Sequence, residues 1–258
     1  MTEIERQKRN SWGFRMKKLG VNRENQKKTN RGLVLKLVAT KRCTSRIDLA
    51  WMTGLTKTAI SQIVNELIEQ DYLVETKKEA SAGLGRNPVG LAISPRAPRY
   101  AGVQVHREGA RAVLCDMQAN ILKSEEVWRS YGSGEELMES VYGLLDRVLE
   151  QEDHVAGIGI CSIGPVSIKE GKIARPLYFN KIGNIEIRRL IEERYHLPGF
   201  FDHDNQSAVQ AEQLFGSGRG YQDVLLVSIG GGVGCGILVD GKRVHSFLGY
   251  APESGHIS

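Results

Sequence analysis

The sequence predicts an α/β fold in its longer second part, preceded by a small and mainly helical first part. Beyond Tyr100, short apolar stretches alternate with amphipathic helical stretches, as in α/β domains. The charge also changes there: residues 1–100 carry 20 basic and 9 acidic side chains, whereas residues 101–258 carry 15 and 21. A basic part joined to an acidic part favours a polyanion-binding module attached to a second function, with a solvated basic arm as the alternative.

The composition is typical of a globular protein. Hydrophobic residues make up 41% of the 258 positions and charged residues 25%. No apolar run approaches the roughly 20 residues that cross a bilayer, and the N-terminus is too polar for a signal peptide. The four cysteines form no C-x-x-C pair, so we expect reduced thiols and a cytoplasmic location.

Three helices are expected in the basic part. Ser45 is predicted to cap a short helix, Gly54 to end it, and Thr56 to cap a second helix that runs to about Gln70. An earlier helix contributes apolar side chains to the same core. The positions expected in this core are Leu33, Leu35, Leu37, Val38, Ile60, Ile63, Val64, Leu67 and Ile68.

The other face of the second helix carries hydroxyl and amide side chains with one cation. A helix-turn-helix needs such groups near the N-terminal end of its second helix, because that end meets base edges in the major groove. A polar solvent face of an ordinary helical hairpin is the alternative. The DNA-contacting residues predicted on this face are Thr56, Lys57, Thr58, Ser61, Gln62 and Asn65.

A strand, a Gly/Ala/Ser loop and a second strand follow, which is the pattern of a β-hairpin wing. Lys77 and Arg86 are predicted to contact DNA here, and Arg86 suits a minor groove, where negative potential attracts arginine. A solvated loop arginine is the alternative for Arg86. We therefore predict a winged helix-turn-helix over 27–94 and a stiff, proline-containing linker over 95–99.

Residues 1–26 show no clear period and are predicted to be a basic arm. The arm either contacts the DNA backbone or lies partly outside the natural protein, because Met16 is a plausible start beside Met1. The sequence leaves both interpretations open.

The acidic part is predicted to alternate strands and helices before ending in a strand pair. Helices are expected over 134–151, 184–196 and 205–218. Strands are expected over 100–106, 110–117, 121–128, 155–164 and 199–204.

The strand pair contains "SIGGGVGCGIL", residues 228–238. Glycines spaced in this way let backbone N–H groups close on an anion, so the stretch resembles a phosphate cradle. Hairpins that use glycine only to turn are the alternative.

Several spaced motifs together resemble one known family, the ROK proteins (repressors, open reading frames, kinases). The helix-turn-helix is followed in the family's order by "GRNP", "GIGICSIGPVSIKEGKI", "FFDHDNQSAVQAEQLFGSGRG", "SIGGGVGCGILVDGK" and "GYAPESGH". The chain looks most like the sugar-responsive regulators of the xylose-repressor type. The resemblance implies a winged helix-turn-helix followed by an actin-like, ribonuclease-H-like sugar kinase domain.

The resemblance also implies a sugar site. The family's Asn-Asp motif falls on His203 and Asp204, and in the kinases this Asp is the general base. Glu253 and His256 match the family's E-x-G-H element, and Asn180 is expected to line the same cleft. The structural alternatives are an N-cap role for Asp204 and a satisfied, partly buried ring for His203.

A kinase needs two phosphate-binding loops and a metal-associated acidic residue. The family's Asp-x-Gly-Gly-Thr turn is replaced here by "VQVHREGARAVL", in which Glu108-Gly109 is a poor substitute. We therefore predict no enzymatic activity. On this interpretation the glycine run is a hairpin kept for backbone geometry and the shape of the sugar cleft.

The family continues beyond the E-x-G-H element into a zinc-binding cysteine cluster and most of a second lobe. Because this sequence stops at Ser258, we expect a C-terminally truncated chain, with a first lobe and an incomplete second lobe in residues 100–258. Zinc needs about four ligands, and His256 has no cysteine partners, so no metal or other cofactor is predicted. A surface normally covered by the second lobe would be an aggregation risk.

The predicted function is a sugar-responsive repressor of carbohydrate-utilisation genes, released from operator DNA by a sugar that shifts its conformational population. Xylose is the first effector to test, with glucose and an amino sugar as alternatives. A homodimer on a palindromic operator is expected, provided that the dimer surface survives truncation. The alternative functions are an ATP-dependent sugar kinase and a truncated DNA-binding fragment that does not respond to sugar.

Overall fold

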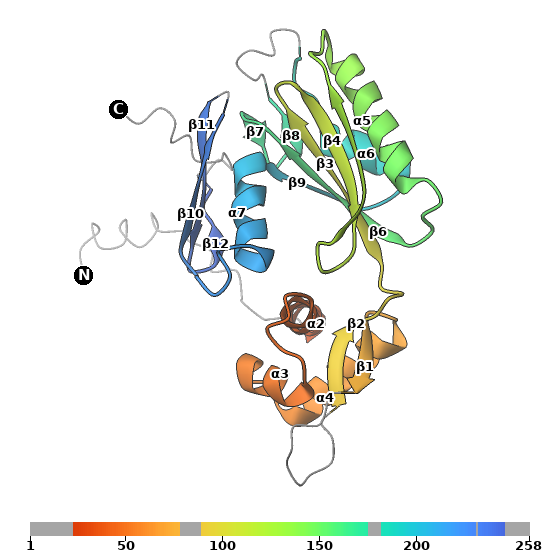
Figure 1. Ribbon diagram of the computed structural model, residues 1–258, viewed down its shortest axis with the longest axis vertical. Coiled ribbons are helices and arrows are strands. Elements are labelled where there is room, and N and C mark those ends of the chain that lie inside the picture. The colour runs from red at the N-terminus through yellow and green to blue at the C-terminus, as the bar shows by residue number, and fades with distance from the viewer. Residues whose placement is uncertain (1–22, 78–88, 175–181, 231, 246–258) are drawn as a thin grey trace, which may run out of the picture.

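A computed structural model of the chain describes residues 23–77, 89–174, 182–230 and 232–245 (Figure 1). Residues 23–93 form what we call the helical unit: α2 (Arg23–Ala39), α3 (Arg46–Thr53), α4 (Lys57–Glu69), and the strands β1 (Leu73–Lys77) and β2 (Val89–Ile93). Residues 99–245 form the α/β unit. In Figure 1 the helical unit lies at one end of the molecule.

The predicted caps of the helical unit are confirmed. The Ser45 hydroxyl accepts a hydrogen bond from the Asp48 amide at 3.2 Å, and the Thr56 hydroxyl accepts one from the Ala59 amide at 3.2 Å. Gly54 ends α3 with φ of +69°, a left-handed conformation that glycine adopts without steric cost. These caps set the turn between α3 and α4.

The core of the helical unit differs from the prediction in α2. The expected side chains that are buried are Leu37, Val38, Ile60, Ile63, Val64 and Leu67, and Leu35 and Ile68 are partly buried against them. Leu33 is instead 38% exposed, and Val34 takes its place in the core. Helix α2 begins at Arg23, so the boundary expected between residues 26 and 27 falls inside this helix. The sequence thus predicted the helix and most of its buried face, but it placed the start of the helix too late and Leu33 in the core in place of Val34.

The two strands of the predicted wing pair antiparallel, from Leu73 opposite Ile93 to Lys77 opposite Val89. Their connection, residues 78–88, lies outside the described residues. The chain then turns after Ser94, whose carbonyl accepts from the Ala97 amide at 3.0 Å. Strand β3 begins at Arg99, so the last residue of the predicted linker belongs to the α/β unit.

The α/β unit is built on a five-stranded sheet in the order β5-β4-β3-β6-β9. Strands β3 (Arg99–His106), β4 (Gly109–Cys115) and β5 (Ile121–Trp128) are antiparallel, because short turns join them. Helices α5 (Gly134–Leu149) and α6 (Ile187–Tyr195) precede β6 (Val155–Ser162) and β9 (Gly199–His203). Such crossovers make β3, β6 and β9 parallel.

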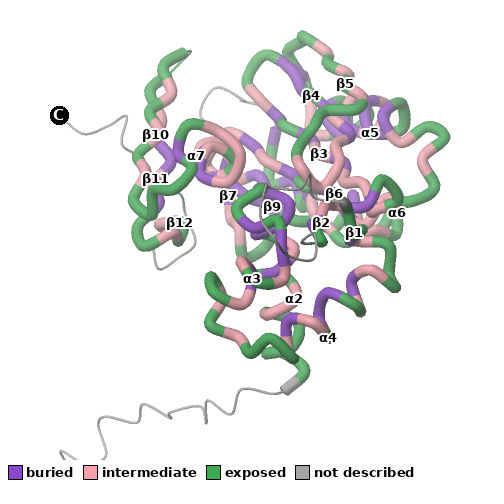
Figure 2. The backbone as a smooth tube through the Cα atoms, turned by 60° about the horizontal axis from the view of Figure 1, so that its bottom comes forward, coloured by how far each residue is buried: buried purple, intermediate pink, exposed green. Residues whose placement is uncertain are grey.

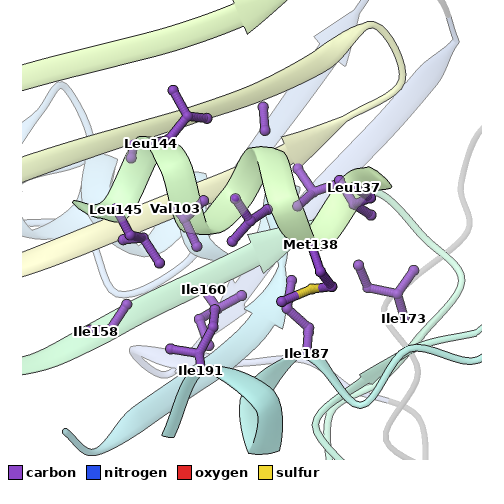
Figure 3. Packing of buried hydrophobic residues seen from close by; sticks show 14 of the residues in the cluster. Val103, Leu137, Met138, Leu144, Leu145, Ile158, Ile160, Ile173, Ile187 and Ile191 are labelled. Carbon is purple, nitrogen blue, oxygen red and sulfur yellow. The ribbon is translucent and has the colours of Figure 1, made fainter. Parts of the chain in front are cut away.

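The core of the α/β unit lies between this sheet and its two helices (Figure 3). Leu137, Leu144 and Leu145 of α5 pack with side chains of β3, β6 and α6. Ser133 caps α5 by accepting from the Glu136 amide. The apolar period of the sequence predicted these elements, whereas the two-residue strands β7 (Val166–Ser167) and β8 (Lys172–Ile173) are too short to leave a pattern.

The described chain ends with α7 (Asp204–Phe215) and a sheet of β10 (Val224–Ile229), β11 (Val233–Val239) and β12 (Lys242–Arg243). Helix α7 packs against β10 and β11. The opposite side of β10 exposes Leu225, Val227 and Ile229, and much of this hairpin is exposed in Figure 2. Among the described residues, no helix has the length and apolar character that crossing a bilayer requires.

Candidate functional site

The polar face of α4 is accessible in the structure. Thr56, Lys57, Thr58, Gln62 and Asn65 are exposed, and Ser61 is half-buried. The helix is held from behind by Ile60, Ile63, Val64 and Leu67, which fixes the direction of this face. The amide of Gln62 donates to the Glu66 carboxylate at 3.3 Å. The face is therefore rigidly supported and open to a ligand.

Asn65 is not a free side chain, because Arg46 binds it. The guanidinium of Arg46, at the first position of α3, donates to Asn65 Oδ1 at 2.9 Å and to Glu75 Oε1 at 2.9 Å. It also donates to the Ser61 carbonyl at 3.3 Å. The sequence analysis missed Arg46 because the residue lies on another helix, outside the polar stripe of α4.

Two predicted wing contacts cannot be placed as side chains. Lys77 is the last residue of β1, where its backbone pairs with Val89, and its side chain lies outside the described part of the structure. Arg86 lies within the undescribed residues 78–88. Both remain predictions.

The corner between β9 and α7 holds two residues of the predicted sugar site. His203 is the N-cap of α7, and its Nδ1 accepts from the Asn205 amide at 3.2 Å. The same amide also donates to Asp204 Oδ1 at 2.6 Å. Asp204 is the first residue of the helix, with a carboxylate oxygen 3.0 Å from His203 Nδ1. The N-cap role considered for Asp204 thus belongs to His203.

Asp202 is a buried carboxylate at this corner that the sequence analysis missed. One oxygen accepts from the His203 amide at 2.7 Å and lies 3.4 Å from His245 Nε2. The other pairs with the guanidinium of Arg243 on β12. Local sequence patterns could not predict that Asp202 meets Arg243 and His245, because 41 residues separate Asp202 from Arg243.

Cys161 of β6 borders the same acidic corner. Burial, together with the charges of Asp204 and Asp202, raises the pKa of its thiol to about 12. A thiol held in this protonated state is inert as a nucleophile. Cys161 therefore serves packing in this corner.

The glycine run packs the β10–β11 hairpin against α7. A Cβ on Gly236 would lie 2.0 Å from the Asn205 carbonyl oxygen, and one on Gly234 would lie 2.3 Å from Asn205 Nδ2. Gly230 has no atom within 4 Å of a Cβ position, and the same holds for Gly232. Among the described glycines of the run, those that need to be glycine are the ones that face the helix.

The turn between β3 and β4 lies where the family resemblance led us to look for a phosphate-binding loop. The ring of His106 lies against Trp128, with centroids 5.0 Å apart and ring planes tilted by 56°. Burial lowers the pKa of His106, although Glu108 and Glu126 oppose this shift. Gly109 has φ of +153°, and a Cβ there would lie 1.9 Å from the Val127 carbonyl oxygen, so this glycine serves close strand packing.

Three members of the predicted sugar site lie outside the described residues: Asn180, Glu253 and His256. Within the described ranges, no group of three His, Cys, Asp or Glu side chains could hold a metal ion. An open groove of about 800 Å³ lies elsewhere, between the first turns of α5 and α6. Neither His203 nor Asp204 lines this groove, so we do not assign the sugar to it.

The chain is similar to known proteins over both units, but the family pattern matches only the part that contains the α/β unit. The ROK family pattern matches residues 100–258. The xylose repressor of Bacillus subtilis strain 168 is 27% identical over 239 residues, covering 90% of this chain and 61% of the relative. The transcriptional repressor Mlc of Escherichia coli K12 is 27% identical over 241 residues, covering 89% and 58%. The chain spans about three-fifths of the length of these relatives.

Two solved structures, one of a regulator and one of a kinase, differ in how much of this chain they match. A ROK family transcriptional regulator, a homologue of E. coli Mlc, superposes with a TM-score of 0.74 at 26% identity, over 90% of this chain and 59% of its own. A ROK glucokinase from Streptomyces griseus, solved with glucose and AMPPNP, superposes with a TM-score of 0.57 at 26% identity, over 62% and 50%. The regulator thus matches more of this chain than the kinase does.

Proposed function

The chain belongs to the ROK family, and we propose that it acts there as a sugar-responsive, DNA-binding transcriptional repressor. The observation that carries this proposal is the extent of similarity. Relatives named as repressors match about 90% of the chain, including most of the helical unit, whereas the glucokinase matches 62%. The ROK family pattern covers residues 100–258, so the helical unit with its polar helix face lies outside it.

In this proposal the helical unit is a winged helix-turn-helix over 27–94. Helix α4 enters the major groove, and α3 crosses the backbone. Hydroxyl and amide side chains then meet base edges, and Lys57 with the wing cations meets phosphates. The proposed contacts are Thr56, Lys57, Thr58, Ser61, Gln62, Asn65, Lys77 and Arg86.

The sugar binds at the corner between β9 and α7 in this proposal. Asp204 accepts a hydrogen bond from one hydroxyl, and the His203 ring forms a hydrogen bond with another. Asn180, Glu253 and His256 complete the site by resemblance to the family. A sugar that binds one conformation better than the other shifts the population away from the DNA-bound form.

The partners follow from the same proposal. A homodimer on a palindromic operator gives each helical unit one half-site. The chain works as a regulator and not as an enzyme, because the β3–β4 turn offers no Asp-x-Gly-Gly-Thr loop for a phosphate. Xylose is the effector to test first, followed by glucose and N-acetylglucosamine. The last is included because a relative from E. coli is named N-acetylglucosamine repressor.

The test is fluorescence anisotropy of labelled DNA from upstream of this gene, titrated with the purified chain at two salt concentrations. We expect sequence-preferring binding that weakens with salt, and release when xylose, glucose or N-acetylglucosamine is added. Binding that depends on salt but not on sequence would contradict the repressor. Sugar-dependent ATP consumption would favour the kinase alternative, and DNA binding unaffected by any sugar would favour the fragment.

A further inference from the structure

We propose that Arg46 is a positioning residue of the DNA interface, which fixes the Asn65 amide so that Asn65 reads hydrogen-bond acceptors on a base edge. The inference rests on the proposed function and deepens it at one position of the helix. It assigns a specificity-determining role to a residue outside the predicted contact face.

The orientation of the Asn65 amide follows from the chemistry of its partner. A guanidinium has five N–H donors and no acceptor. The amide atom 2.9 Å from Arg46 Nη2 must therefore be the oxygen, Oδ1. The planar amide then turns its NH₂ group away from Arg46. Asn65 is exposed, so this NH₂ group is open to a ligand.

Arg46 is itself held from three sides. It begins α3, donates to Ser61 and Asn65 on α4, and pairs with Glu75 on β1. Its side chain is only 28% exposed. A planar, forked donor set that reaches three acceptors is pre-organised, so little motion is left to the Asn65 amide. The same contacts join the wing strand to the recognition helix.

The charge of Arg46 is already compensated. Glu75 lies 2.9 Å from Nη2, which is the distance of a charge-assisted hydrogen bond. An arginine that neutralises a phosphate would need this donor free. The geometry therefore favours positioning over a direct backbone contact.

The consequence for base reading is specific. Asparagine recognises adenine by accepting from N6 with its oxygen and donating to N7 with its nitrogen. In this chain the oxygen is turned to Arg46, so the adenine pairing is not available. The free NH₂ group instead suits guanine, whose O6 and N7 are two adjacent acceptors in the major groove. Adenine also has the N7 acceptor, but the N6 amino group beside it is a donor that the NH₂ group cannot pair with.

The experiment is selection from a library of DNA duplexes with a randomised centre, followed by anisotropy on the selected sequence and its single-base variants. The chain of residues 1–258 is compared with Arg46→Ala, Asn65→Ala and the double variant. Arg46→Lys is included because it keeps the charge but cannot span three acceptors, which provides a second variant if Arg46→Ala folds poorly. Lys36→Ala, which removes an exposed cation of α2, is the matched control. Circular dichroism checks that each variant is folded.

We expect the native chain to prefer guanine at one position of each half-site by about tenfold over adenine, the range of one good base contact. Arg46→Ala and Arg46→Lys release the amide, so the preference moves toward adenine at that position alone. Asn65→Ala loses the preference, and the double variant behaves like Asn65→Ala, because Arg46 acts through Asn65. Lys36→Ala keeps the native base preference.

Three outcomes would overturn the inference. An unchanged motif in both Arg46 variants would show that Arg46 does not orient Asn65. If both Arg46 variants lose affinity equally for every sequence, and their salt dependence is shallower by about one phosphate contact, Arg46 contacts the DNA backbone directly. Either result leaves the proposed repressor standing. If the native chain enriches no sequence at all, both the inference and the proposed function fail.

Discussion

Asp202 shows, at the scale of a single residue, how burial decides the importance of a charge. Its side chain is 9% exposed, whereas its partner Arg243 is 40% exposed. Removing Arg243 leaves a buried carboxylate with fewer donors, whereas removing Asp202 leaves an arginine that water can reach. The two halves of one ion pair are therefore unequal in their effect on stability.

We expect Arg243→Ala to lower the free energy of unfolding by about 3 kcal/mol, near the low end for an uncompensated buried charge. Asp202→Asn should cost less. Urea unfolding measures both. Arg189→Ala is the control, because Arg189 pairs with Glu186 and Glu193 on an exposed face of α6, and no measurable change is expected there. Equal losses in Arg243→Ala and Arg189→Ala would contradict this account.

His106 makes stability depend on pH. Burial lowers its pKa in the folded chain, so the folded state binds a proton less readily than the unfolded state, in which the pKa is about 6.5. The contribution of the neutral ring to stability is thus fully present above about pH 6.5. It is lost as the pH falls from there toward the folded pKa.

The variant His106→Phe keeps a ring on Trp128 but removes the titration. We expect it to lose less stability than the native chain between about pH 6.5 and 5, as measured by urea unfolding at several pH values. Parallel profiles of the two proteins over this interval would show that His106 does not carry the dependence.

At the scale of elements, the contact between β11 and α7 explains the glycine run. Alternate residues of a strand point to the same face, so Gly234 and Gly236 both face the helix. The main chain of Asn205, one residue after Asp204, lies where the Cβ of Gly236 would stand. The hairpin therefore sets the position of the helix that begins at the proposed sugar site.

We expect Gly236→Ala to push α7 away from β11 and to lower the free energy of unfolding by about 2–3 kcal/mol, the usual cost of overpacking. Gly230→Ala, in the same hairpin but with open space at its Cβ, should leave stability nearly unchanged. Urea unfolding of the two variants is the measurement. A larger loss in Gly230→Ala would indicate that the turn, and not the helix contact, requires glycine.

At the scale of the whole molecule, few described contacts join the helical unit to the α/β unit. Arg219, four residues after the end of α7, donates to the carbonyl of Thr40 just beyond the end of α2. The charge of Lys41, in the helical unit, also acts on Asp116 of the α/β unit. Burial raises the pKa of Asp116, but hydrogen bonds from Asn120 and Gln118 and the charge of Lys41 more than offset this effect, so the pKa is lowered. Helix α7 thus runs from the proposed sugar corner to the end of the helical unit (Figure 1).

If sugar releases DNA, we expect Arg219→Ala to reduce the release several-fold while sugar affinity without DNA stays the same. The reason is that a rigid helix transmits a shift only through its end contact. Anisotropy with and without sugar, beside calorimetric titration of sugar alone, measures both quantities. Arg189→Ala is again the control, and native-like release by Arg219→Ala would exclude this contact as the coupling.

The sequence by itself determined the helices, the main strands and the polar face of α4, because each depends on a local period or a local cap. Ser45, Gly54 and Thr56 marked the turn between α3 and α4, and the buried side of α4 followed from its apolar spacing. The order of spaced motifs also predicted the family, which the match over residues 100–258 confirms. The contact residues on α4 and at the β9–α7 corner remain predictions.

Only the tertiary structure decided what those residues touch. Arg46 meets Asn65 across 19 positions of sequence, Asp202 meets Arg243 across 41, and Arg219 meets Thr40 across 179. Periodicity indicates which side of an element is buried, but it does not indicate which other element lies against that side. Hydrogen bonds and ion pairs need particular atoms within about 3 Å, and only the packing of distant elements sets such distances.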